Sequence, residues 1–148
     1  MEAHSIRTTI VGTGSFIPAR RVPNSEFLGH AFYGPDGQVL DRGTDEIIDK
    51  FQAITGINTR HYVTDDQCTS DIACLAALDA LASSGADKES LDYLIVAHNF
   101  GDVPANNRRS DLVPTLAARV KHRLGIKNPK TIAYDLPFGC AGWLQAVI

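Results

Sequence analysis

The sequence predicts an α/β domain with a largely parallel sheet, and two observations carry that prediction. Short apolar, β-branched segments alternate along the chain with longer segments whose apolar residues have helical spacing, an order typical of βαβ units. Residues 93–97 (Y-L-I-V-A) are also an unbroken apolar run, as expected of a central parallel strand covered on both faces.

Eight elements are predicted from apolar spacing and from residues that start or stop helices. They are a buried strand over residues 8–17, a short helix over 25–31, a helix over 45–55, a strand over 59–64, a helix over 71–84, a strand over 93–97, a helix over 113–124 and a strand over 131–136.

The elements of the first half are justified as follows. β-branched residues indicate the first strand, which Pro18 ends. Asn24 and Thr44 each precede a helical segment, and their side chains suit the N-cap position. The helix after Thr44 has acidic residues in its first turn, where the helix dipole favours them, and Gly56 is its expected stop.

The second half repeats the alternation of helix and strand. Ser70 is expected to cap a helix so rich in alanine and leucine that it should be mostly buried. Gly85 and Gly125 are the expected stops of the two long helices. The last strand leads into an apolar segment from Cys140 to Ile148, which is typical of a helix that begins at Cys140.

That final segment has no C-cap and no polar tail, so a chain ending there would leave carbonyl groups and an apolar face uncovered. We therefore expect the natural protein to continue beyond residue 148. The alternative is a short natural chain whose last helix docks on a partner.

Composition narrows the function classes. The chain has 148 residues, of which 44% are hydrophobic and 21% charged, and its formal net charge is −3. These values are typical of one folded domain and disfavour a nucleic-acid-binding protein, which is normally basic. No apolar run approaches the roughly 20 residues of a membrane span, and no signal peptide is recognisable. Three unevenly spaced cysteines indicate neither a metal site nor a disulfide framework, so a cytoplasmic location is expected.

Cys140 is the strongest candidate for a functional residue. It follows an apolar strand and a short turn and precedes a helical segment. A helix N-terminus favours a thiolate, and its N–H groups can hold the oxyanion of an acyl intermediate. Small neighbours such as Gly139 and Gly142 leave room for a substrate. The alternative is a buried cysteine that only packs.

Three segments together resemble one enzyme family. The segment A-Y-D-L-P-F-G-C-A-G-W, which contains Asp135 and Cys140, resembles the nucleophile segment of the β-ketoacyl-[acyl-carrier-protein] synthase III family, of thiolase fold. The segments I-V-G-T-G-S-F-I-P (residues 10–18) and T-G-I-N-T-R-H (residues 55–61) resemble two earlier segments of that family. Their order and spacing cover nearly the whole chain and agree with the N-terminal half of such a synthase.

The resemblance implies a thiolase-like half domain over residues 1–148, with a mixed, mainly parallel sheet, helices on both faces and the second half absent. It implies an acyltransferase in lipid metabolism that performs decarboxylative Claisen condensation. Cys140 would accept the acyl group, and its partner His and Asn would lie beyond residue 148, so the isolated chain should be inactive. Acyl and malonyl thioesters would be substrates, acyl carrier protein a partner and a homodimer the assembly, with no metal and no bound cofactor.

The chain departs from the family in three places. The stretch before the T-G-I segment has neither the Trp nor the Arg that often contact coenzyme A, although Phe51 lies there. Residues 30–43 and 103–110 look longer than the family's loops. These departures indicate a divergent paralogue and favour a carrier protein over coenzyme A as its acyl donor, a choice that the sequence leaves open.

Several weaker signals have two interpretations. Gly12 and Gly14 do not complete a dinucleotide fingerprint, because position 17 is Ile, so they are expected to permit a tight turn. His98 ends a strand and is either a base near Cys140, as a cysteine hydrolase would need, or a structural histidine. Cys68 and Cys74 are expected to pack.

One basic pair and one further class of protein complete the alternatives. Arg108 and Arg109 lie in a solvated loop or help to dock an acidic carrier protein. The alternative to an enzyme is a non-catalytic thiolase-like module for dimerisation or interaction.

Overall fold

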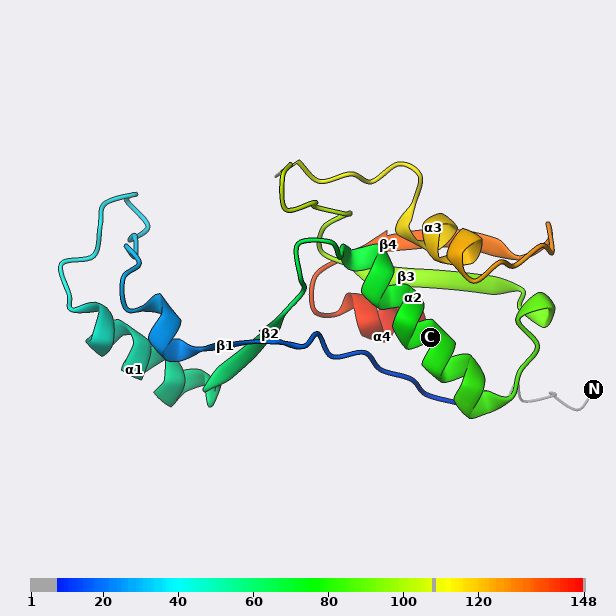
Figure 1. Ribbon diagram of the computed structural model, residues 1–148, viewed down its shortest axis with the longest axis horizontal. Coiled ribbons are helices and arrows are strands. Elements are labelled where there is room, and N and C mark those ends of the chain that lie inside the picture. The colour runs from blue at the N-terminus through cyan, green and yellow to red at the C-terminus, as the bar shows by residue number, and fades with distance from the viewer. Residues whose placement is uncertain (1–7, 108, 148) are drawn as a thin grey trace, which may run out of the picture. The chain divides into compact units, whose positions relative to one another are not determined.

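The computed structural model describes residues 8–107 and 109–147, which form two compact units. Unit 1 holds the residues up to Ile17 and from Asp65 onward, and unit 2 is Pro18–Thr64. Figure 1 shows the elements of each unit. Two residues named above lie outside the described residues: Arg108 of the basic pair and Ile148 at the end of the apolar segment.

Unit 1 is built on two parallel strands, β3 (Tyr93–His98) and β4 (Ile132–Pro137). Both were predicted to within one residue at each end. Their register places Leu94 beside Ala133 and Val96 beside Asp135. The expectation that residues 93–97 are a central strand is wrong for the part of the chain that the structure describes, because β4 is the only strand paired with β3 there.

Helices cover both faces of this pair of strands, as the fold class predicted. Side chains alternate between faces along a strand. On one face, Leu94 and Val96 pack in the core with α2 (Thr69–Ser84) and α3 (Leu116–Arg123). Two residues of α3, Ala117 and Val120, are almost fully buried there. The opposite face carries Ala97, which lies against Gly142 at the start of α4 (Gly142–Val147).

The predicted strand over residues 8–17 is wrong. The segment forms no strand and runs along α2 in the opposite direction, with Gly12 beside Ser84 and Gly14 beside Ala80. A Cβ on either glycine would collide with the helix, so close approach, rather than the tight turn we expected, explains these glycines. With no neighbouring strand to pair with, its β-branched residues stay exposed, and Val11 is 74% exposed.

The long helices end as predicted but begin elsewhere. Gly85 and Gly125 both have positive φ values, which suit a glycine stop. The N-cap of α2 is Cys68 rather than Ser70, whose backbone already belongs to the helix. The start of α3 is at Leu116, not Val113, because a residue before proline avoids helical geometry and Thr115 then caps the helix.

The interior of α2 is less buried than predicted. Only Ser70 and Cys74 are fully buried in it, and Leu78 is 50% exposed. The helix packs against α3 and against the N-terminal segment, and these two neighbours leave part of its apolar surface uncovered.

Unit 2 pairs β1 (Arg20–Pro23) with β2 (Thr59–Tyr62) in antiparallel fashion, so the predicted strand near residue 59 is confirmed. Its helix α1 (Thr44–Thr55) ends at Gly56 as expected. The short helix predicted over 25–31 is a 3₁₀ turn, η1 (Asn24–Phe27).

Neither predicted cap of unit 2 has that role. Gly43 is the N-cap of α1, because the hydroxyl of Thr44 donates to the carbonyl of Leu28 at 2.7 Å. Asn24 instead donates from Nδ2 to the carbonyl of Ile57 at 2.8 Å, which links η1 to the residues after α1.

A second 3₁₀ turn, η2 (Lys88–Ser90), precedes β3. Within the described ranges, none of the helices has the length and apolar character required to cross a membrane.

Candidate active site

Cys140 lies in the turn that joins β4 to α4. The N–H of Gly142 donates to the carbonyl of Gly139 at 2.8 Å and closes this turn, so α4 begins only at Gly142. The expectation that Cys140 belongs to the first helical turn is therefore wrong by two residues. Cys140 is exposed, and an added Cβ at Gly139 would meet nothing within 4 Å, so a substrate can approach this turn freely.

The turn opens onto a cavity of about 520 Å³ in unit 1. The cavity lies between the end of β3 and α4. Its apolar wall includes Ile95, Ala97, Phe138, Trp143 and Val147. Cys140 and Asn99 are among its polar lining residues. A thiol beside a cavity of this size with one apolar wall is an arrangement that suits a group with a hydrocarbon part.

His98 also lines this cavity, but its ring belongs to the other face of the strands. Its Nε2 lies 3.1 Å from Oδ2 of Asp135, and both side chains are almost fully buried. Asp135 in turn accepts hydrogen bonds from the N–H groups of Leu116 and Ala117, at 2.7 and 2.8 Å. The ring therefore lies on the α3 side of the strands, whereas α4 and the turn of Cys140 cover the opposite side.

This placement favours the structural interpretation of His98. The buried Nδ1 atom has no hydrogen-bond partner among the described residues. A Cys–His dyad would require the ring to reach the thiol, and its bond to Asp135 holds it on the other face. The cysteine-hydrolase alternative thus loses the base that it needs.

The other two thiols lie in or next to α2 and are less suited to react. Burial, with the nearby carboxylates of Asp102 and Asp71, raises the pKa of Cys68. Burial also raises the pKa of Cys74, which belongs to the core of unit 1. A raised pKa lowers the thiolate fraction at neutral pH, so burial makes both thiols poorer nucleophiles.

A buried polar cluster near the end of β3 was not predicted. Asp102, three residues after Asn99, pairs with Arg119 of α3 at 2.8 Å. Burial alone would raise the pKa of Asp102, but hydrogen bonds from Ser70 and Arg119 outweigh it and lower that pKa. Burial alone would lower the pKa of Arg119, but the carboxylates of Asp111 and Asp102 outweigh it and raise that pKa. These residues come from distant segments with no shared motif, so no local signal could have revealed them.

Unit 2 has a smaller cavity of about 140 Å³, and Phe51 is one of its lining residues. Phe51 packs edge-on against Phe32 with ring centroids 5.9 Å apart, and the guanidinium of Arg60 lies 5.2 Å from the centroid of Phe27. Residues 30–43, the loop that looked long, fold back on themselves through a bridge between Tyr33 and Val39.

Within the ranges that the structure describes, no three His, Cys, Asp or Glu side chains gather as a metal site would require. Arg109 is exposed in the loop of residues 103–110.

Comparisons with known proteins confirm the resemblance. The chain is 35% identical over 139 residues to the β-ketoacyl-[acyl-carrier-protein] synthase III of Staphylococcus aureus strain Newman. The match covers 94% of this chain but only 37% of that synthase, so the chain spans just over a third of its relative's length. No family model matches the chain.

Solved structures confirm the fold. The β-ketoacyl-[acyl carrier protein] synthase III of Thermus thermophilus is 31% identical, with a TM-score of 0.68 over 94% of this chain and 36% of that one. The OleA protein of Xanthomonas campestris is 18% identical, with a TM-score of 0.69 over 94% of this chain and 37% of its own, and it supports the fold alone. The chain has the thiolase-like fold of part of these enzymes.

Proposed function

We propose that this chain, similar to part of β-ketoacyl synthases III, supplies the acyl-accepting cysteine of a condensing enzyme. The observation that carries the proposal is the position of Cys140. It is an exposed thiol in the turn after β4, beside a cavity with an apolar wall, in the segment that resembles the nucleophile segment of that family.

The reaction has two steps at Cys140. The thiolate attacks the carbonyl carbon of an acyl thioester, a new C–S bond forms, and the donor leaves as a thiol after taking up a proton. A malonyl thioester then loses CO₂, and the electron pair of the broken C–C bond attacks the acyl-enzyme carbonyl. The Cys140 thiolate departs, and a β-ketoacyl thioester is released.

The surroundings of Cys140 suit the first step. Gly139 leaves the turn open to a thioester, whereas the wall formed by Ile95, Ala97 and Val147 offers apolar surface to the acyl chain. Burying one methylene contributes about 0.8 kcal/mol, so this wall can bind and orient an acyl group.

The remaining groups of the mechanism are part of the proposal. The resemblance implies a His and an Asn beyond residue 148 that activate the malonyl carbanion, and a domain over residues 1–148 that is inactive alone. Acyl carrier protein as a partner, a homodimeric assembly and a cytoplasmic location remain predictions of the same resemblance.

Product formation by the full natural chain tests this function. With an acyl thioester and a malonyl thioester, wild type should release CO₂ and form a β-ketoacyl product. Cys140→Ala should lower the rate by about 10³-fold or more, because removal of a covalent nucleophile abolishes the acyl intermediate. Cys68→Ala is the matched control and should retain activity. A folded wild type without condensing activity would favour the interaction module.

A further inference from the structure

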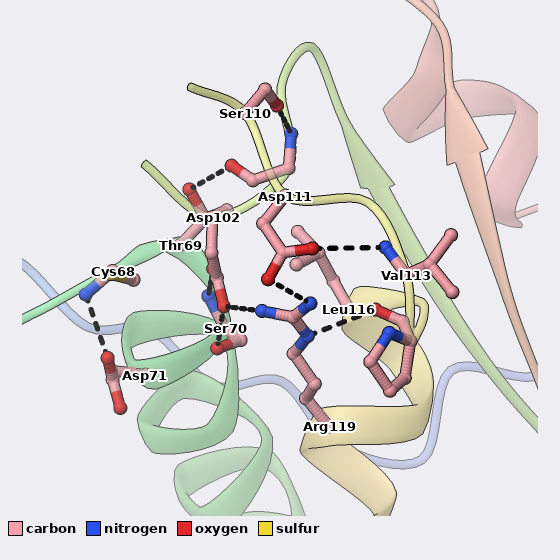
Figure 2. Close-up of polar contacts among 12 residues, drawn as sticks. Cys68, Thr69, Ser70, Asp71, Asp102, Ser110, Asp111, Val113, Leu116 and Arg119 are labelled. Carbon is pink, nitrogen blue, oxygen red and sulfur yellow. Dashed lines mark hydrogen bonds and ion pairs between the residues drawn. The ribbon is translucent and has the colours of Figure 1, made fainter. Parts of the chain in front are cut away.

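Four polar residues form a cluster that joins three separate segments of unit 1. We call Ser70, Asp102, Asp111 and Arg119 the neck cluster, because they surround the base of the loop formed by residues 103–110. Figure 2 shows the guanidinium of Arg119 between the two carboxylates. The cluster lies outside the cavity of Cys140, and the proposed reaction does not use it.

Arg119 binds three acceptors at once. It donates from Nη1 to Asp102 at 2.8 Å, from Nη2 to Asp111 at 2.9 Å, and from Nε to the carbonyl of Pro114 at 3.0 Å. Its side chain is 18% exposed. A planar guanidinium can serve three acceptors in fixed directions, which the ammonium of a lysine cannot reproduce.

Asp102 fixes the inner side of the neck. Its carboxylate is 7% exposed and accepts from the N–H and the hydroxyl of Ser70, at 2.8 and 2.7 Å, as well as from Arg119. These three hydrogen bonds hold the buried charge of Asp102 only where every partner is in place. These hydrogen bonds connect the first turn of α2 to the segment that follows β3.

The loop leaves and returns through this neck. The backbones of Asp102 and Asp111 exchange two hydrogen bonds, at 3.1 and 2.8 Å. The hydroxyl of Ser110 accepts from the N–H of Gly101 at 2.8 Å. An added Cβ at Gly101 would collide with the backbone of Asp111, so the two chain segments are in close contact.

The neck determines the position of the short segment between β3 and the loop. Only Phe100 and Gly101 separate Asn99, which lines the cavity of Cys140, from the anchored Asp102. We infer that Arg119 is a positioning residue, which holds Asp102 and Asp111 together and so fixes the Asn99 edge of the Cys140 cavity. The inference rests on the proposed function insofar as that cavity receives the acyl thioester.

Three variants of the full natural chain test this inference. Arg119→Gln removes both ion pairs, Arg119→Lys keeps a charge without the fork, and Asp111→Asn loosens only the half-exposed pair, should Arg119→Gln fail to fold. Arg123→Gln is the matched control, since Arg123 lies on the same helix and pairs with Asp71, away from the loop.

Hydrogen exchange is the first measurement. The amides of Gly101, Asp102 and Asp111 should exchange about tenfold faster in Arg119→Gln than in wild type, because opening of the neck exposes them. Arg119→Lys should be intermediate and Arg123→Gln unchanged. Unchanged exchange at these three amides in folded Arg119→Gln would overturn the inference, whatever the activity.

The second measurement compares two reactions of Cys140 in the folded variants. Acylation by an acyl thioester needs a correctly formed cavity, so it should slow by about tenfold or more in Arg119→Gln. Alkylation by iodoacetamide needs only access and should change less than twofold. Equal effects on both reactions would overturn the positioning role. If the variants exchange as predicted but wild type is never acylated, the proposed function is contradicted. The exchange result then still decides whether Arg119 holds Asp102 and Asp111 together.

Discussion

The three cysteines of this chain differ in the properties that control thiol reactivity. Cys140 is exposed in an open turn, whereas burial and nearby carboxylates raise the pKa of Cys68, and burial raises that of Cys74. Because the thiolate is the reacting form, a raised pKa makes Cys68 and Cys74 less reactive.

Limited treatment with iodoacetamide at pH 7 checks this order. Cys140 should be alkylated first and Cys68 and Cys74 more slowly, because they are less exposed and a raised pKa lowers their thiolate fraction. Peptide mapping by mass spectrometry gives the three rates. Alkylation of Cys68 as fast as Cys140 would contradict the account.

Asp135 is the second decisive residue, because it links β4 to α3 and to His98. Replacement by Ala removes the acceptor for two helix N–H groups and for the buried ring, so Asp135→Ala should lower the free energy of unfolding by about 3–5 kcal/mol. Urea unfolding measures the loss. Asp92→Ala, at an exposed residue just before β3, is the control and should change it by less than about 0.5 kcal/mol.

At the scale of elements, strands were easier to predict than helix starts. Residues 93–97 are an unbroken apolar run, residues 132–137 are apolar except for Asp135, and both segments lie between glycines, so sequence alone located β3 and β4. The caps were less predictable. Ser70 and Thr44 have suitable hydroxyls, but each hydroxyl has a distant partner, Asp102 or Leu28, which local sequence does not reveal.

The N-terminal segment shows how tertiary context overrides propensity. Its β-branched residues favour a strand, yet a strand requires a neighbouring strand, and the segment packs on α2 instead. Ser15 donates its N–H to Oδ2 of Asp79 at 2.9 Å, which fixes it there. Gly12 and Gly14, which were expected to permit a turn, are the residues that permit this contact.

Gly14→Ala tests this contact. The new methyl group would collide with the backbone of α2 at Ala76 and Ala80, so the variant should lose about 1–3 kcal/mol of unfolding free energy. Thermal unfolding followed by circular dichroism reports the change. The control is Gly29→Ala, where a Cβ meets no atom within 4 Å, and equal stability of the two variants would refute the contact.

The neck cluster makes the stability of the chain depend on pH in the acid range. Hydrogen bonds from Ser70 and Arg119 overcome burial and lower the pKa of Asp102 below its ordinary value of 3.8. A lowered folded-state pKa means that this stabilisation is complete above pH 3.8 and is lost as the pH falls through the folded-state pKa. The stability advantage of wild type over Asp102→Asn should therefore be constant from pH 7 to 5 and shrink below pH 4, as urea unfolding can measure. An advantage independent of pH down to 3 would contradict this.

For the molecule as a whole, the fold was predictable because three weak motifs occur in the order of one family. The comparisons confirm that order over 94% of the chain. The candidate site was predictable only in part. Cys140 stays a prediction that rests on its motif. The side on which His98 lies follows from the strand register, and the neck cluster follows from packing between segments that share no pattern.

The central claim is that Cys140 carries the acyl group. Its most direct test is mass spectrometry of the full natural chain after incubation with an acyl thioester and an acid quench. The account predicts one added acyl mass, mapped to the peptide that contains Cys140 and absent in Cys140→Ala. An acyl group on Cys68 or Cys74, or no acylation of the folded wild type, would contradict the claim.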